Sequence, residues 1–226
     1  MIEIRNVSHR FGDRQVLDGL DLTITERRVA VIGANGSGKS TFARLLNGLL
    51  VPDSGTVGVD GSDTRADAKA VRRKVGFVFQ DPDAQIVMPL VEEDVAFGLK
   101  SRRLPAAEVA EKVDAVLDRF GLTALRQQQT HRLSAGEKQL LALSSVLVME
   151  PAYVVFDEPT TMLDLRNKRM IHQVIAGLAQ TAILVSHDLE LLQDFERVLV
   201  FDGGRVVYDA APVPAVARYR EMMNGT

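Results

Sequence analysis

A glycine-rich stretch between an apolar run and an amphipathic segment constrains this chain more than any other feature. The stretch reads GANGSGKST from Gly33 to Thr41 and matches the pattern G-x-x-x-x-G-K-[ST]. The run before it, Val29 to Ile32, has the composition of a short buried strand, and Phe42 to Leu50 carries apolar residues at helical spacing. The pattern therefore predicts a strand, a phosphate-binding loop and a helix in succession.

The residue types in this loop suit a polyphosphate ligand. Glycine lets the backbone come close to the ligand, since a Cβ would collide with it. The loop N–H groups and the helix N-terminus direct positive partial charge toward the phosphates. Lys39 is expected to neutralise the β- and γ-phosphates, and the Ser40 hydroxyl to coordinate Mg²⁺. We therefore predict nucleotide contacts along the whole loop: Gly33, Ala34, Asn35, Gly36, Ser37, Gly38, Lys39, Ser40 and Thr41.

The composition fits a globular chain with a substantial core. Of 226 residues, 46% are hydrophobic and 25% are charged, and the net charge of −3 gives no electrostatic argument for nucleic acid as the main partner. Cysteine is absent, so disulfide and thiolate chemistry are excluded. No apolar run approaches the roughly 18 residues needed to cross a bilayer. The alternating start MIEIRNVSHRF reads as a strand and not as a signal peptide.

Strand and helix patterns alternate around the loop, which predicts an α/β fold with a mainly parallel sheet. The expected elements are strands at 75–79, 152–156 and 182–185, helices at 91–99, 105–120, 164–178 and 214–223, a helix from Ser134 to Met149, and a hairpin around 198–208. We expect one domain over residues 1–226. Its parts are a parallel core with an N-terminal β-subdomain, at about 1–90 and 151–226, and a helical subdomain at about 91–150.

Polar residues stand where several of the expected strands end. Gln80 follows one strand, Asp157 and Glu158 follow another, and His187 follows a third. In an open parallel sheet, ligands bind beyond the carboxyl ends of the strands, so these side chains are expected to converge on the γ-phosphate. Asp157 and Gln80 are then candidate partners of Mg²⁺, with Ser40. Glu158 is the candidate that orients or deprotonates the attacking water, and His187 the candidate that contacts the γ-phosphate.

An aromatic residue stands alone at a turn upstream of the loop. Phe11 lies next to Gly12 and Asp13, where an exposed ring can serve as a platform for a stacked purine. We assign Phe11 and Val16 to the same nucleotide site as the glycine-rich loop.

Taken together, these motifs resemble those of ATP-binding cassette (ABC) ATPases, and the resemblance covers nearly the whole chain. GANGSGKST is similar to the Walker A loop, VVFDEP at Val154–Pro159 to Walker B with its catalytic glutamate, and Gln80 to the Q-loop glutamine. LSAGE is similar to the signature sequence and consists of Leu133, Ser134, Ala135, Gly136 and Glu137. TTMLD is similar to the D-loop and contains Asp164, and SHD is similar to the switch-histidine motif and contains His187. The resemblance implies a P-loop NTPase fold of the ABC ATPase type, with a RecA-like parallel core, an N-terminal antiparallel β-subdomain and a helical subdomain that bears the signature.

The family resemblance also implies a dimer. Two cassettes associate head to tail, so that each ATP is bound between one Walker A loop and the partner's signature, where Ser134 and the backbone of Gly136 would contact the γ-phosphate. Two residues depart from the usual LSGGQ: Ala135 replaces glycine and Glu137 replaces glutamine. A complete motif set permits a homodimer, and a heterodimer with a related cassette is the alternative.

A narrower resemblance comes from Phe79–Leu99, which is similar to the corresponding stretch of energy-coupling factor (ECF) transporter ATPases. That resemblance implies a transmembrane coupling subunit, a substrate-binding membrane subunit and a peripheral place on the cytoplasmic face of the membrane. We expect the acidic stretch, with Asp83, Gln85, Glu92 and Glu93, to receive a basic coupling helix. Little sequence beyond one expected helix follows the hairpin. This short C-terminal part resembles that of the ATPase of biotin transporters, and the ATPases of cobalt and nickel importers are the close alternative.

Three other functions compete with transport. A soluble ABC ATPase of DNA repair would carry a long coiled-coil insertion, and one of translation would carry two cassettes; 226 residues without a heptad tract fit neither. A GTPase would need an NKxD motif, whereas Asn167-Lys168-Arg169-Met170 lacks the Asp. A non-hydrolysing regulatory cassette is disfavoured because Glu158 and His187 are both present.

Overall fold

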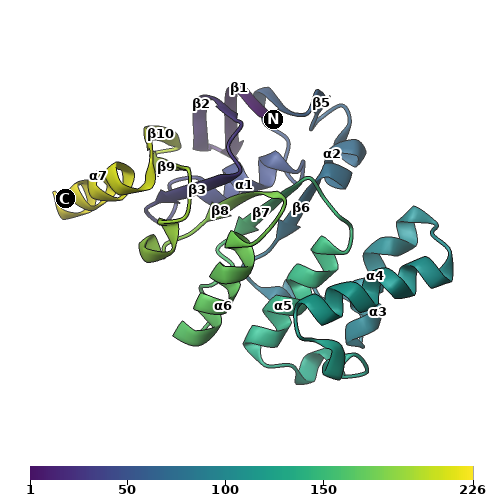
Figure 1. The fold of residues 1–226 in the computed structure, drawn as a ribbon. Coiled ribbons are helices and arrows are strands. Elements are labelled where there is room, and N and C mark those ends of the chain that lie inside the picture. Colours follow the sequence, from purple (N-terminus) through teal and green to yellow (C-terminus); the bar gives the residue numbers. More distant parts are fainter. Residues whose placement is uncertain (226) are drawn as a thin grey trace.

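The computed structural model describes residues 1–225, which form two β-sheets with helices packed around them (Figure 1). The strands are β1 Ile2–Phe11, β2 Arg14–Ile24, β3 Arg28–Gly33, β4 Ser54–Val59, β5 Ser62–Asp63, β6 Val75–Val78, β7 Tyr153–Asp157, β8 Thr181–Val185, β9 Arg197–Asp202 and β10 Arg205–Ala210. The first sheet is four-stranded with the order β2-β1-β4-β5, and the second is six-stranded with the order β10-β9-β3-β8-β7-β6.

The helices occupy the connections between these strands. They are α1 Lys39–Leu46, α2 Ala68–Lys74, α3 Val91–Phe97, α4 Ala106–Arg119, α5 Ala135–Leu147, α6 Leu165–Ala176 and α7 Pro212–Asn224, with a 3-10 helix η1 at Pro82–Ala84. Within residues 1–225, none of the helices is both long and apolar enough to span a bilayer.

The strand directions confirm the predicted fold class. In the six-stranded sheet β9, β3, β8, β7 and β6 run parallel, and only β10 runs antiparallel, as the second strand of the C-terminal hairpin. The four-stranded sheet is antiparallel throughout. The chain thus has the parallel core, the antiparallel N-terminal sheet and the helical part that the sequence predicted.

The five parallel strands are buried on both faces of the sheet, so most of their positions are apolar. In β3, Val29 and Val31 belong to a cluster that includes α1 and the antiparallel sheet. Ala30 and Ile32 belong to a second cluster that includes α3 to α7. Because successive side chains of a strand point to opposite faces, one short strand contributes to both cores.

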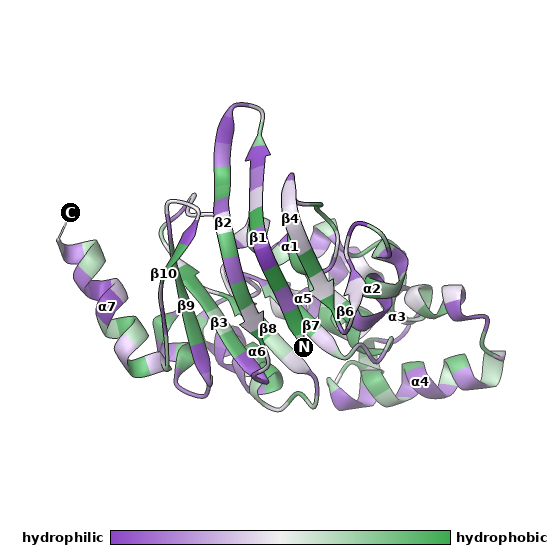
Figure 2. Cartoon of the chain, turned by 90° about the horizontal axis from the view of Figure 1, so that it is seen from above, coloured by the Kyte–Doolittle hydropathy of each residue, from purple (hydrophilic) through white to green (hydrophobic). Residues whose placement is uncertain are grey.

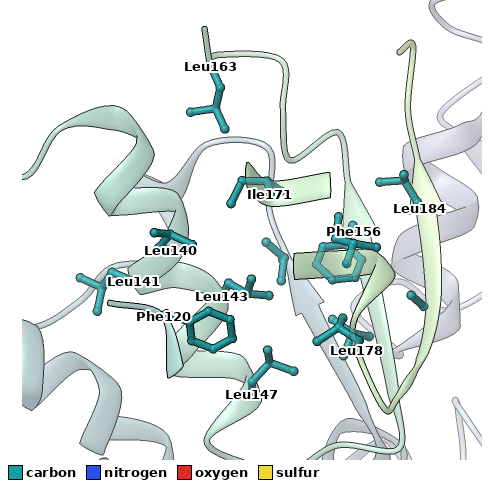
Figure 3. Packing of buried hydrophobic residues seen from close by; sticks show 14 of the residues in the cluster. Phe120, Leu140, Leu141, Leu143, Leu147, Phe156, Leu163, Ile171, Leu178 and Leu184 are labelled. Atoms are coloured by element: carbon teal, nitrogen blue, oxygen red, sulfur yellow. The ribbon is translucent and has the colours of Figure 1, made fainter. Parts of the chain in front are cut away.

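The helical part packs on the sheet through α5. Figure 3 shows Leu140, Leu143 and Leu147 of this helix directed toward Phe156 of β7, with Phe120 beside them. Phe156 is fully buried. These contacts anchor the helix that begins at the signature sequence to the strand that ends at Asp157.

Some element boundaries differ from those predicted. The helix after the phosphate loop begins at Lys39 and ends at Leu46, so the loop's lysine and serine already lie in its first turn. The helix α2 was not predicted, because only Val71 of its residues is buried and a basic segment carries little apolar periodicity.

A buried arginine joins the start of β3 to the end of α6. Arg28 is 8% exposed, and its guanidinium donates hydrogen bonds to the carbonyl oxygens of Ala176, Leu178 and Gln180. A cation at a helix C-terminus satisfies carbonyl groups that have no partner within the helix. Burial lowers the pKa of Arg28.

We predict that Arg28→Met destabilises the fold by about 2–3 kcal/mol, since one buried and two partly buried carbonyl groups would lose a charged donor. The measurement is the free energy of unfolding in urea. Arg205→Met is the matched control, because Arg205 is exposed and its side chain pairs, among residues 1–225, only with Asp18. Its loss should cost no more than about 0.5 kcal/mol. Equal effects of the two substitutions would contradict this assignment.

Candidate nucleotide-binding and hydrolysis site

The glycine-rich loop connects β3 directly to α1 and holds its lysine inward. Lys39 is buried, and its Nζ donates hydrogen bonds to the carbonyl oxygens of Gly33 and Ala34, each at 2.8 Å. Burial holds the pKa of Lys39 below its usual value, and the negative charges of Glu158 and Asp157 partly offset this shift. The ammonium group is therefore bonded to the loop backbone and lies in the electrostatic field of two carboxylates.

Two glycines of the loop are required by the protein's own backbone. A Cβ at Gly33 would lie 2.3 Å from the carbonyl oxygen of Phe201 in β9. A Cβ at Gly38, where φ is +106°, would lie 2.7 Å from the carbonyl oxygen of Val16 in β2. Both distances are far below van der Waals contact, so these positions exclude a side chain independently of any ligand.

The hydroxyl of Ser40 and the carboxylate of Asp157 meet where α1 faces the end of β7. Ser40 Oγ donates a hydrogen bond of 2.7 Å to Asp157 Oδ1, and Arg44 Nη2 lies 3.7 Å from Asp157 Oδ2. Asp157 is buried, and burial raises the pKa of this carboxyl, while the Ser40 hydrogen bond and Arg44 oppose the rise. A hydroxyl and a carboxylate oxygen form a donor set that suits Mg²⁺.

Glu158 and His187 form a close pair beside this site. His187 Nε2 lies 2.6 Å from Glu158 Oε1, and Thr161 Oγ1 donates a hydrogen bond of 3.1 Å to Glu158 Oε2. Glu158 has a φ of +53°, a conformation that is uncommon for a residue with a side chain and is found at functional sites. Its N–H bonds to the carbonyl oxygen of Val185, which ties the turn after β7 to the end of β8.

An open cavity of about 280 Å³ lies between the β1–β2 turn and the loop. Its lining residues are Phe11, Arg14, Val16, Asn35, Gly36, Gly38, Lys39, Ser40, Thr41 and Glu158. Figure 2 shows that the β1–β2 hairpin extends beyond β4, which leaves its turn free to cover a ligand. The structure thus brings the predicted base platform, the phosphate loop and the predicted catalytic glutamate to one cavity.

The predicted base platform, Phe11, and one cation, Arg14, line the outer part of this cavity. Phe11 is 52% exposed and contacts the His9 ring edge to face, with ring centroids 4.9 Å apart. Arg14 was not predicted as a site residue. Its Nη2 lies 3.2 Å from the point that a Cβ would occupy at Gly36. No sequence pattern points to Arg14, because a single arginine after a turn usually belongs to the solvated surface.

The signature sequence forms the N-terminus of α5 as the capping-box pattern predicted. Ser134 Oγ accepts a hydrogen bond from the Glu137 N–H, and Glu137 Oε2 accepts from the Ser134 N–H at 2.7 Å. The Ala135 side chain is exposed, so this departure from glycine fits the subunit without a clash. Gly136 is buried, and a Cβ there would displace the Asn167 amide, whose Oδ1 would be 2.5 Å away.

The positions of Asp164 and Gln80, two further predicted site residues, do not by themselves establish a role in the nucleotide site. Asp164 accepts a hydrogen bond from the Asn167 N–H and caps α6, a structural role that a D-loop assignment does not require. Gln80 is exposed just after β6, and no hydrogen bond in the described part of the chain joins it to Ser40 or Asp157. Its assignment to Mg²⁺ or to water stays a prediction.

The acidic stretch is largely paired within the chain. Asp83 pairs with Lys138, and Glu92 pairs with Arg126 at 2.7 Å. The Gln85 amide bonds to the backbone of Phe79 and Ala142. Of the four predicted interface residues, only Glu93 has no ion pair or side-chain hydrogen bond within residues 1–225.

Three features meet at one edge of the parallel sheet: the phosphate loop, the Asp157 carboxylate beside Ser40, and the Glu158–His187 pair. Together they form a site that can bind and hydrolyse a nucleoside triphosphate. The family model for ABC transporters matches residues 17–161, which include the loop, the signature and Asp157. The chain belongs to the ABC transporter family. This ABC protein is an ATP-binding ATPase, and cassettes of its kind act as dimers together with membrane components.

Comparisons with individual proteins extend over the full length of the chain. The biotin transport ATP-binding protein BioM of Rhizobium etli is 51% identical over 221 residues, covering 98% of each chain. The energy-coupling factor transporter ATP-binding protein EcfA1 of Mycoplasmoides gallisepticum is 38% identical, covering 94% of this chain and 78% of its own. The solved structure of CbiO1 from Clostridium perfringens, part of the ABC transporter complex CbiONQ, superposes with a TM-score of 0.85 at 33% identity, covering 99% and 93%.

We predict that Lys39→Ala weakens ATP binding by this ABC ATPase about 10- to 100-fold, because a charged donor to the phosphates is lost. Isothermal titration with ATP measures the affinity. Lys69→Ala is the control, since Lys69 is an exposed lysine on α2 outside the cavity. An affinity within twofold of the parent for Lys39→Ala would place the nucleotide elsewhere.

Proposed function

We propose that this ABC ATPase is the energising subunit of an ECF-type membrane importer and that the transported solute is biotin. The observation that carries the hydrolytic part is the Glu158–His187 pair, 2.6 Å apart and adjacent to the cavity that contains the phosphate loop. The full-length similarity to a biotin transport protein supports the cargo, and the similarity to an ECF ATPase supports the class of importer.

In this proposal ATP occupies the cavity with its base on the Phe11 ring and its phosphates along the loop. Lys39 would exchange its two carbonyl partners for phosphate oxygens, which form stronger, charge-assisted hydrogen bonds. Arg14 would add a second cation at the outer side of the loop, near Gly36. The face of an aromatic ring stacks on any purine, so this arrangement favours triphosphate recognition over base selection.

Hydrolysis would depend on Glu158 and His187. Glu158 would orient the attacking water and accept its proton, and His187 would keep the Glu158 carboxylate in place and contact the γ-phosphate. Thr161 would fix the second carboxylate oxygen by its hydrogen bond. Mg²⁺, held by Ser40 and Asp157 with Gln80 as a further candidate, supplies charge neutralisation at the β- and γ-phosphates when bound.

We propose a homodimer in which the signature of one subunit completes the site of the other. The N-terminus of α5, with Leu133, Ser134, Ala135, Gly136 and Glu137, offers backbone N–H groups and a helix dipole to the γ-phosphate of ATP on the partner. Asp164 of the D-loop lies at the neighbouring helix N-terminus. ATP binding would close the two subunits, and hydrolysis would open them again.

We propose that the surface around α3 docks on the transmembrane coupling subunit, with the ATPase peripheral on the cytoplasmic face of the membrane. Glu93 of α3 has no ion-pair partner among residues 1–225, and Val87 and Phe97 nearby are 59% and 48% exposed. An unpaired carboxylate flanked by exposed apolar side chains fits a basic amphipathic helix. A separate membrane subunit would bind the solute, so no residue of this chain needs to touch it.

Cobalt import is the second candidate, because the chain is also 41% identical to the cobalt import ATP-binding protein CbiO of Syntrophus aciditrophicus, covering 94% of this chain and 79% of that protein. We favour biotin because the biotin transport protein has higher identity over nearly all of both chains. A soluble ABC ATPase without a membrane partner remains the alternative outside transport, and the experiments below separate it from both importers.

We predict that Glu158→Gln abolishes ATP-dependent uptake of labelled biotin in cells that carry this gene with its chromosomal neighbours. The substitution removes the proton acceptor and retains the shape of the side chain, so ATP still binds and the dimer stays closed. Labelled cobalt ion is measured in parallel.

Uptake of cobalt in place of biotin would reassign the cargo. Uptake of neither solute, with ATP hydrolysis by the purified chain intact, would refute both importer assignments and leave the ABC ATPase. Biotin uptake by Glu158→Gln at the parent's rate would show that Glu158 is not the catalytic base.

We predict that Glu93→Lys lowers the yield of the complex with the membrane subunits about tenfold, equal to about 1.4 kcal/mol, because it opposes a basic helix with a like charge. Co-purification measures the yield. Glu111→Lys is the matched control, since Glu111 is an exposed glutamate of α4 with the same change in charge. Glu92→Lys is unsuitable, because it would break the Arg126 pair within the subunit. Equal yields for both variants would reject this docking surface.

A further inference from the structure

The segment after Gln80 is attached to the signature helix by two side chains. The Asp83 carboxylate lies 2.7 and 2.8 Å from Lys138 Nζ through its two oxygens. Gln85 Nε2 donates a hydrogen bond of 2.6 Å to the carbonyl oxygen of Ala142. Both partners lie on α5, although they are 55 and 57 residues away in sequence.

The second end of Gln85 reaches back to the strand that leads into Gln80. Gln85 Oε1 accepts a hydrogen bond of 3.2 Å from the N–H of Phe79, the residue immediately before Gln80. The Gln85 amide therefore connects the backbone at Phe79, one residue before Gln80, with the backbone of α5. While both hydrogen bonds persist, a displacement of the backbone at Phe79 is transmitted through Gln85 to α5.

The two attachments share one face of the helix. Lys138 and Ala142 are four residues apart on α5, so they lie one above the other, one turn apart. Lys138 follows the signature residues Ser134 to Glu137 directly. The 81–85 segment therefore lies along the first turns of α5 and contacts the end that bears the signature, while Asn167 of α6 lies against Gly136.

The exposure of the ion pair argues against a role in stability alone. The Asp83 side chain is 61% exposed and that of Lys138 is 18% exposed. Ion pairs in contact with water contribute little to the free energy of folding. Attachment at two points does, however, fix the position of the 81–85 segment against α5, because two separated bonds prevent both sliding and rotation.

We propose that Asp83, Gln85 and Lys138 form a brace that moves the signature turn together with Gln80 when nucleotide binds. They are positioning residues for the proposed closure of the dimer, and the inference rests on that proposed function. Asp83 and Gln85 thereby act within the subunit, and docking on the membrane subunit is left to Glu93 and its apolar neighbours. A nucleotide contact at Gln80 would be transmitted to the surface that meets ATP on the partner.

The test is hydrogen–deuterium exchange of residues 134–142 in the purified full chain, with and without saturating ATP, in a Glu158→Gln background that does not consume the ligand. In the background chain ATP should slow exchange in this segment. Gln85→Met and Lys138→Met should remove most of that ATP-dependent protection, because methionine keeps the length of the side chain and lacks the donor. ATP is kept saturating for every variant, because coupling between the nucleotide and the signature turn is reciprocal and its loss also lowers the affinity for ATP.

Two controls separate positioning from general loosening. Lys112→Met removes a similar ion pair in the same helical group, with Glu150, whose side chains are 23% and 65% exposed; it should retain the protection. Exchanging the charges, Asp83→Lys with Lys138→Asp, should restore what Lys138→Met removes. Equal ATP-dependent protection in the parent and both brace variants would overturn the brace, as would no protection in a background chain that binds ATP. Failure of the background chain to bind ATP at all would instead refute the proposed function.

Discussion

The alignment of three parallel strands determines where the chemistry of this chain takes place. Val185 of β8 pairs with Val31 of β3 on one side and with Asp157 of β7 on the other. β7 and β8 therefore end level with each other, and β3 continues beyond Val31 to Gly33. The loop that follows β3 lies beside the carboxylate that ends β7. The 2.7 Å hydrogen bond from Ser40 to Asp157 joins residues 117 positions apart and depends on this register. A buried Asp157 without that partner would be costly, so fold and site support one another.

The same loop also positions the antiparallel sheet. Gly38 packs against the carbonyl oxygen of Val16, so β2 passes directly over the loop, and Gly33 packs against the end of β9. Because β2 is fixed there, the β1–β2 turn has to bring Phe11 and Arg14 to the rim of the cavity. The glycines were predicted from their closeness to a phosphate, whereas the structure gives them a second cause, which is the closeness of the protein's own backbone. A glycine-to-alanine substitution would therefore disturb the assembly of the two sheets before any nucleotide arrives.

Sequence reasoning succeeded where one periodicity or one short motif decides the outcome. Apolar runs ending in polar residues predicted the parallel strands, and the rule for strand ends predicted that Asp157, Glu158 and His187 lie together. It failed for side-chain pairs between distant segments, since no local pattern records that Glu92 meets Arg126 at a separation of 34 residues. Arg14 was missed for the same reason. The acidity of the 81–94 stretch was therefore read as surface charge, although Asp94 is buried and accepts hydrogen bonds from Val87 and Met88.

The capping box at the signature has a consequence for the proposed dimer. Glu137 places a carboxylate on the N–H and hydroxyl of Ser134, so an anion already occupies the positive end of α5. A γ-phosphate from the partner's ATP would have to compete with this carboxylate, whereas the glutamine usual at that position is neutral. Lys138, one residue on, is engaged by Asp83 and does not offset the charge of Glu137. The glutamate thus stabilises the helix in the single subunit, and in the proposed dimer it would oppose closure until its side chain leaves Ser134.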